Sequence, residues 1–336
     1  MPMMTNAAEE SGEDRLIARY FKPLAKHPAA LGLIDDAAAL TPPAGQDLVL
    51  KADAIVGGIH FFPDDPPETV AQKALRVNLS DLASKGAVPL GFLLSLALPK
   101  SADAGWLERF SQGLGADADR YDCPLLGGDT VRSPDAVMVS IAVVGTLPQG
   151  TMVKRSGARP GDRIVVTGTI GDAALGLCLR QDPGAASRWR LQPEDCGHLA
   201  RRYLVPEPRI AIAEVVRAHA SAAMDVSDGL AGDLGKLCRA SGVSADVQVA
   251  RVPLSSGARA AFAAEPDMIE RILTGGDDFE VVAAVPPAHL PDMRTATSMA
   301  GVALSEIGVV IEGKGAPRFL LHDQPLKFAQ RSFSHF

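Results

Sequence analysis

Apolar residues recur along this chain with two different periods. A spacing of three to four residues predicts helices, whereas alternating or β-branched apolar runs predict strands. In the first half, the pattern predicts helices over residues 15–24, 67–85 and 104–121 and strands over residues 48–53, 92–98 and 136–145. In the second half, it predicts strands over residues 163–167, 222–226 and 280–285 and helices over residues 172–179, 194–204, 209–219 and 229–240. We therefore expect a mixed α/β fold (α+β elements in both halves).

Prolines and glycines crowd residues 148–161, just before a new strand, so we expect a domain boundary near Gly150. The chain would then consist of a loose tail (residues 1–14), an N-terminal domain (residues 15–149) and a C-terminal α/β domain (residues 150–336). A length of 336 residues suits two such domains.

The composition narrows the class of protein. A hydrophobic content of 47% with 22% charged residues is typical of a globular protein. A net charge of −7 argues against nucleic acid as a partner, and the longest apolar stretch, residues 91–98, is too short to span a membrane. The start lacks the apolar core of a signal peptide, and the four cysteines form no C-x-x-C pair. We expect a cytoplasmic protein with reduced thiols that binds neither nucleic acid nor membrane.

Five short segments carry Asp beside apolar runs, which predicts turns at strand ends or helix starts: residues 34–37, 78–81, 127–130, 225–229 and 275–278. Hard divalent cations prefer carboxylate oxygens. Five such segments in one acidic chain therefore suggest a convergent cation site.

Each segment also has a structural interpretation. Asp225 and Asp228 could face one cation, with Ser227 and a helix start available to phosphate, or they could cap the helix that follows. The glycines before Asp129 could let phosphates approach the backbone, or they could form a tight turn. Asp81 falls within an apolar helical pattern, so it needs a partner, which could be a metal, a lysine or a helix cap.

Taken in order, these segments resemble the thiamine-monophosphate kinase family, which belongs to the aminoimidazole ribonucleotide synthetase-like superfamily. The resemblance covers about residue 12 to the C-terminus, and its matching segments are residues 16–21, 35–36, 53, 58–61, 73–83, 127–130, 155–162, 225–230 and 275–280. Single motifs are modest signals, but their order and spacing are specific.

The resemblance implies an ATP-dependent phosphotransferase. It would transfer the γ-phosphoryl group of ATP to thiamine monophosphate, the last step of thiamine diphosphate biosynthesis, by Mg²⁺-assisted direct in-line transfer. The implied fold has an N-terminal domain that dimerises through its sheet and a C-terminal α/β domain, so the partners are the two substrates and a second copy of the chain. The alternatives are another ATP-dependent member of the superfamily and a non-catalytic nucleotide-binding relative.

The same resemblance assigns roles to individual residues. Several Mg²⁺ ions would be held by Asp36, Asp53, Asp81, Asp129, Asp225 and Asp228. ATP would contact Gly128, Asp129, Arg155 and Ser227. Thiamine monophosphate would contact His60, Asp277 and Phe333.

No general base is implied; the metal ions with Asp129, Asp225 and Asp228 would carry the transfer. This is consistent with the acceptor, because a phosphate monoester has a second pKa near 6 and is already anionic at neutral pH. Four residues depart from the family pattern: Ile34 replaces a glycine, Lys51 and Ala52 replace a Ser or Thr pair, and Asp277 stands where Glu is common. Lys51 could supply the charge of one cation, or it could point to solvent.

Overall fold

The structure is a computed structural model that describes residues 12–333. The described chain forms two compact units, and each is assembled from several stretches of sequence. The first unit comprises the chain up to Thr41, Ala52–Ala74 and Leu90–Val144. The second comprises Pro42–Lys51, Leu75–Pro89 and the chain from Gly145 onward. The expected tail, residues 1–14, lies almost entirely outside the described residues.

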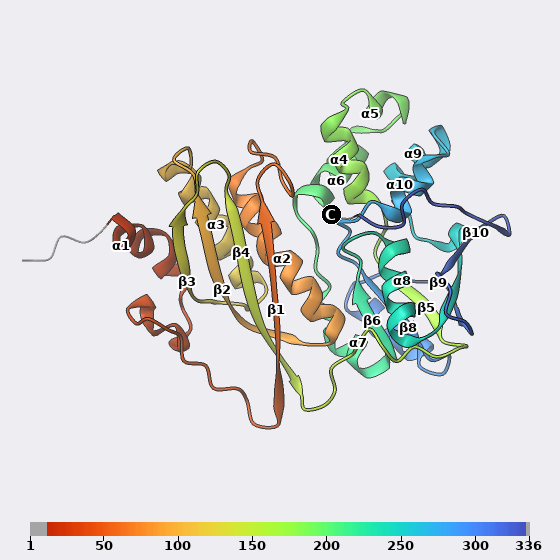
Figure 1. Ribbon diagram of the computed structural model, residues 1–336, viewed down its shortest axis with the longest axis horizontal. Coiled ribbons are helices and arrows are strands. Elements are labelled where there is room, and N and C mark those ends of the chain that lie inside the picture. The colour runs from red at the N-terminus through yellow and green to blue at the C-terminus, as the bar shows by residue number, and fades with distance from the viewer. Residues whose placement is uncertain (1–11, 334–336) are drawn as a thin grey trace, which may run out of the picture. The chain divides into compact units, whose positions relative to one another are not determined.

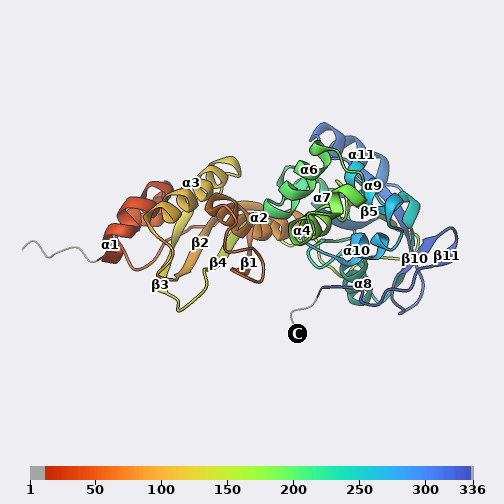
Figure 2. The same cartoon turned by 90° about the horizontal axis from the view of Figure 1, so that it is seen from above.

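A four-stranded sheet with the order β1-β4-β2-β3 occupies the N-terminal half (Figure 1). Its strands are β1 (Gln46–Val56), β2 (Val88–Leu98), β3 (Leu125–Arg132) and β4 (Met138–Pro148). Helices α2 (Pro67–Lys85) and α3 (Ala104–Arg120) lie on one face of this sheet (Figure 2). Shorter turns precede it: α1 (Gly12–Leu16), a π-helical turn (Ile17–Phe21) and 3-10 turns (Lys22–Leu24, Pro28–Leu33).

The side chains of β2 explain how this sheet packs. Phe92, Leu94 and Leu96 alternate along the strand and are all buried, whereas Leu93 and Ser95 between them are exposed. Successive side chains of a strand point to opposite faces, so one face joins the core and the other meets solvent. The Asp103 side chain caps α3 by accepting the Trp106 N–H at 2.8 Å.

A seven-stranded sheet with the order β11-β10-β7-β9-β5-β8-β6 forms the centre of the C-terminal half. Its strands are β5 (Arg163–Thr167), β6 (Ala222–Asp225), β7 (Ser244–Gln248), β8 (Val281–Val285), β9 (Leu304–Ile311), β10 (Arg318–Leu321) and β11 (Gln324–Pro325). Strand β5 pairs antiparallel with both β8 and β9.

Helices cover both faces of this sheet. They are α4 (Asp172–Gln181), α5 (Ala185–Arg188), α6 (Pro193–Leu204), α7 (Ala213–His219), α8 (Leu230–Ser241), α9 (Ser256–Ala264), α10 (Met268–Thr274) and α11 (Leu290–Met299), with 3-10 turns at Ile210–Ile212 and Val249–Arg251. On β5, Ile164 and Val166 join a large core with α4, α6 and α8. Val165 joins the core on the opposite face, with α7 and α11.

The predicted α/β fold is confirmed, and most predicted elements are present within a few residues of their expected ends. The prediction of turns is wrong at residues 127–130, which lie inside β3, and at residues 78–81, which lie inside α2. No helix among residues 12–333 combines the length and apolar character needed to cross a membrane.

Candidate functional site

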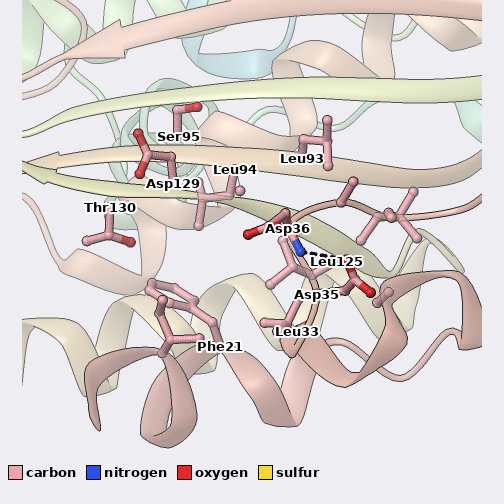
Figure 3. A pocket seen from close by; sticks show the side chains of 17 residues that line it. Phe21, Leu33, Asp35, Asp36, Leu93, Leu94, Ser95, Leu125, Asp129 and Thr130 are labelled. Atoms are coloured by element: carbon pink, nitrogen blue, oxygen red, sulfur yellow. Dashed lines mark hydrogen bonds between the residues drawn. The ribbon is translucent and has the colours of Figure 1, made fainter. Parts of the chain in front are cut away.

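A pocket of about 560 Å³ lies in the first unit between the loop around Asp36 and strands β2 and β3. Figure 3 shows Asp35 and Asp36 on the loop side of this pocket, and Ser95 and Asp129 on the strand side. Ser95 is paired with Asp129 across the two parallel strands. Asp35, Asp36 and Asp129 are all exposed. Two of the predicted metal ligands, Asp36 and Asp129, therefore line one pocket and can be reached by a ligand.

Gly128 has a structural role in β3. A Cβ atom on Gly128 would lie 1.9 Å from the Leu94 carbonyl oxygen of β2. A Cβ atom on the neighbouring Gly127 would meet nothing closer than the Leu93 side chain at 3.4 Å. Of these two glycines, Gly128 is therefore the one that the close approach of the two strands requires.

Asp53 and His60 lie near the end of β1 in the same unit. Asp53 is half-buried on the strand. The His60 ring accepts the Val56 N–H at Nδ1 over 3.0 Å, and the His60 carbonyl accepts a hydrogen bond from Lys73 Nζ at 3.0 Å. These two contacts fix both the ring and the backbone of His60 beside the strand that carries Asp53.

A second group of carboxylates lies in the second unit. Asp225, at the end of β6, is only 3% exposed. Burial, together with the negative charge of Asp81 on α2, raises the pKa of Asp225 to about 8. The buried Asp225 carboxylate and Asp81, two predicted metal ligands, therefore lie in one part of the second unit.

Two lysines accompany this pair. Lys51 Nζ lies 3.0 Å from an Asp81 carboxylate oxygen. The structure therefore supports the interpretation of Lys51 as a charge beside the carboxylates. Lys85 Nζ donates to the Ala223 carbonyl at 2.6 Å, and burial lowers the pKa of Lys85 to about 8.

The loop from Asp225 to Gly229 is held by a residue that sequence reasoning missed. Asp233 in α8 is fully buried, and its Oδ2 accepts the backbone N–H groups of Ser227 at 2.9 Å and Asp228 at 2.8 Å. Lys236 Nζ donates to Asp233 Oδ1 at 2.7 Å and also to the Asp228 carboxylate. The helical pattern of α8 alone suggests a surface position for Asp233. Its partners, the N–H groups of the loop, become visible only in the folded structure.

The predicted substrate residues Asp277 and Phe333 meet this loop. The Asp277 N–H donates to the Ser227 carbonyl at 2.8 Å, and the Phe333 N–H donates to the Asp228 carbonyl at 3.0 Å. Asp277 has a φ of 63° and Phe279 a φ of 50°, both in the left-handed region. Three segments far apart in sequence thus converge in one part of the second unit.

A buried network supports the loop that carries Asp277. Arg202 Nη2 donates to the Asp278 carbonyl at 2.7 Å and to Glu280 Oε1 at 2.9 Å. The Gly171 N–H donates to both oxygens of the Asp278 carboxylate at 2.9 Å. Burial raises the pKa of Asp278 well above its usual value. These contacts fix a strained backbone, which is a common feature of functional loops.

Arg155 is exposed, and its carbonyl accepts a hydrogen bond from Ser241 Oγ at 3.0 Å. Its positive charge contributes, after burial, to the lowered pKa of Lys85. Arg155 therefore lies on the side of the second unit where Lys85 and Asp225 are found.

The chemistry of these donors suits magnesium. Among residues 12–333, no three His, Cys, Asp or Glu side chains are arranged to hold an ion by themselves. Mg²⁺ is usually bound through one or two carboxylates completed by substrate phosphates and water, rather than by an all-protein cage. Carboxylates in pairs, such as Asp36 with Asp129 or Asp81 with Asp225, fit that requirement.

Comparison with known proteins defines the class to which this fold and these acidic segments belong. A model of the AIR synthase related protein N-terminal domain matches residues 34–147, and a model of the C-terminal domain matches residues 159–318. Together they cover most of the chain. The protein is thus an AIR synthase-related protein with both of the domains that define the class.

Individual relatives narrow this class. The chain is 43% identical over 307 residues to thiamine-monophosphate kinase of Caulobacter vibrioides, covering 90% of this chain and 85% of that protein. It is 38% identical to thiamine-monophosphate kinase of Escherichia coli K12, covering 97% of this chain and 98% of that protein. The chain belongs to the thiamine-monophosphate kinase family.

Solved structures agree with this family membership. The crystal structure of thiamine-monophosphate kinase from Stenotrophomonas maltophilia K279a superposes with a TM-score of 0.81 at 36% identity, covering 93% of this chain and 96% of that one. The structure of AaThiL complexed with AMPPCP and TMP superposes with a TM-score of 0.74 at 29% identity, covering 94% and 98%. The hydrogenase maturation protein HypE in complex with ATP, at 20% identity and a TM-score of 0.75, shares the fold alone.

Proposed function

We propose that this chain is a kinase that transfers the γ-phosphoryl group of ATP to thiamine monophosphate, giving ADP and thiamine diphosphate. The observation that carries the proposal is the meeting of the Asp225–Gly229 loop with Asp277 and Phe333 in a chain of this family. A loop that carries two aspartates and a serine suits a metal-bound phosphate, and a half-exposed aromatic ring suits the flat rings of thiamine.

We propose magnesium as the metal of the reaction. Asp36, Asp53 and Asp129 would hold it in the first unit, and Asp81, Asp225 and Asp228 in the second. When bound, the ions neutralise phosphate charge and orient the groups for in-line transfer. The raised pKa of Asp225 supports this assignment, since a bound cation would stabilise its ionised form.

The remaining proposed contacts are those with the two substrates. In the first unit, Gly128 and Asp129 would meet ATP, and His60, with its ring held by the Val56 N–H, would meet thiamine monophosphate. In the second unit, Arg155 and Ser227 would meet ATP. The acceptor phosphate is already anionic at neutral pH, so the chain needs no general base for it.

A steady-state assay with ATP, thiamine monophosphate and millimolar Mg²⁺ tests the function. We expect formation of thiamine diphosphate that stops on addition of EDTA and resumes when excess Mg²⁺ is restored. The Asp228→Asn variant should lose most turnover while keeping its thermal stability within about 1 kcal/mol, the usual limit for exposed ion pairs. ATP binding without turnover in the wild-type protein would instead identify a non-catalytic nucleotide-binding relative.

We also propose a homodimer formed through the open face of the four-stranded sheet. Leu93 is 42% exposed, Val131 50% and Met138 38%, and they lie on β2, β3 and β4. Exposed apolar residues on a sheet face are typical of interfaces. Light scattering after size exclusion should give twice the mass of the chain, and Leu93→Asp should reduce it toward the monomer.

Two further expectations complete the proposal. We place the boundary between an N-terminal domain (residues 15–149) and a C-terminal domain (residues 150–336) near Gly150. We place the protein in the cytoplasm, because its four cysteines are free thiols.

A further inference from the structure

Lys236 is shared between two carboxylates. Its Nζ donates both to Asp228, which is 37% exposed, and to Asp233, which is fully buried. The ammonium group therefore occupies the space beside the Asp228 carboxylate where a cation would be held.

The second partner of Lys236 does not depend on the first. Asp233 accepts the Ser227 and Asp228 N–H groups through Oδ2 and accepts Lys236 through Oδ1. If Asp228 turns to another cation, Lys236 keeps a buried carboxylate as its partner, and the loop backbone keeps both of its hydrogen bonds. The arrangement allows Asp228 to exchange a lysine for a metal ion without disturbing the loop.

We propose that Lys236 acts as a built-in substitute for the metal ion at Asp228, and that it competes with that ion for the carboxylate. This inference rests on the proposed function, because it takes Asp228 as a metal ligand. Lys236 is then a positioning residue: it holds the Asp228 side chain in a binding orientation and sets the metal concentration at which exchange occurs.

Lys51 repeats the arrangement at a second predicted ligand. Its Nζ lies 3.0 Å from Asp81, its side chain is 31% exposed, and Asp81 is 14% exposed. The ammonium group of Lys51 therefore occupies space beside the Asp81 carboxylate that a bound cation would take. The inference therefore extends to Lys51, which competes with the ion at Asp81.

The test measures metal affinity directly. Mn²⁺, a paramagnetic substitute for Mg²⁺, is titrated by electron paramagnetic resonance into the full chain together with a non-hydrolysable ATP analogue. The variants are Lys236→Met, Lys236→Arg, Lys51→Met and Asp228→Asn. Lys314→Met is the control, because Lys314 is exposed and its loss changes the net charge by the same amount.

We expect Lys236→Met and Lys51→Met each to bind Mn²⁺ about tenfold more tightly than the wild type, equivalent to about 1.4 kcal/mol. Lys236→Arg and Lys314→Met should bind as the wild type does. Without metal, Lys236→Met should also melt at a lower temperature, and Mn²⁺ with the analogue should restore a larger part of its stability than in the wild type.

Other outcomes distinguish the competition by Lys236 from the assignment of Asp228 as a metal ligand. Unchanged or weaker Mn²⁺ binding in Lys236→Met, with weaker binding in Asp228→Asn, overturns the competition and leaves Asp228 as a ligand. Unchanged binding in both variants overturns the assignment of Asp228 itself. Tightening in Lys314→Met equal to that in Lys236→Met overturns the inference, because it would reflect net charge alone.

Discussion

Replacing Gly128 by alanine is expected to damage the N-terminal sheet, whereas the same change at Gly127 is not. The added methyl group at Gly128 would lie 1.9 Å from the Leu94 carbonyl oxygen, a distance that real Cβ atoms essentially never show. The obstacle is backbone on a paired strand, so no side-chain rotation relieves it. Strands β2 and β3 would have to move apart to make room for it.

The cost can be placed at the upper end of the range for overpacked interiors, about 3 kcal/mol. For a chain of this size, that corresponds to a fall in the unfolding temperature of roughly 4 °C. Gly127→Ala brings its methyl group to 3.4 Å from a flexible Leu93 side chain, which is ordinary contact. Its expected effect is within about 0.5 kcal/mol, as for most substitutions that create no clash.

Urea and thermal unfolding of both variants, followed by circular dichroism, provide the measurement. A Gly128→Ala protein as stable as the wild type would refute the reasoning, because it would mean that the strands separate at no cost. Turnover adds a second comparison. If ligand phosphates approach the backbone here, Gly127→Ala should raise the KM for ATP while its stability stays intact.

Three further predictions concern the second unit. Folded Asp225, with a pKa of about 8, holds a proton that the unfolded chain releases near pH 4, so the stability of the wild-type protein falls as pH rises from about 4 to about 8. The metal-free Asp225→Asn variant should therefore become more stable relative to the wild type between pH 5 and pH 8. A stability difference that does not change with pH would contradict this. Asp233→Ala leaves two loop N–H groups without their acceptor and should lower the free energy of unfolding in urea by about 2 to 4 kcal/mol. The control, Asp246→Ala, should lower it by at most about 1 kcal/mol, because its partner Arg318 is exposed. Phe333→Ala, at a side chain 51% exposed, should raise the KM for thiamine monophosphate several-fold with little change in stability or in the KM for ATP, and Phe333→Trp should restore it.

The sequence predicted the elements whose signals are local. Helix α2 begins at Pro67 and ends at Lys85 as its apolar spacing indicates, and β5 has the predicted bounds. Strand β3 was missed because two glycines followed by an aspartate favour a turn when read alone. Glycine is required at position 128 because the Leu94 backbone packs against it. Leu94 lies more than thirty residues earlier, so the local sequence does not reveal this contact.

In the candidate site too, the features with local sequence signals could be predicted and those that depend on tertiary contacts could not. The acidic segments could be read from residue types. The substrate roles that the family resemblance gave to Asp277 and Phe333 stay predictions, and the structure adds that their backbones contact the Asp225–Gly229 loop. Asp233 and Lys236 could not be found in this way. A buried aspartate in a helix becomes meaningful only when a loop folds back onto it, and that contact depends on tertiary structure.

The left-handed backbone at Asp277 has a consequence for how this protein can change. A glycine there would adopt the same φ without strain, and relief of such strain is worth on the order of 1 kcal/mol. Selection for stability alone would therefore favour loss of the side chain that we assign to the substrate. Programmes that evolve heat-resistant variants should thus find Asp277 among their first substitutions, and activity among their first losses.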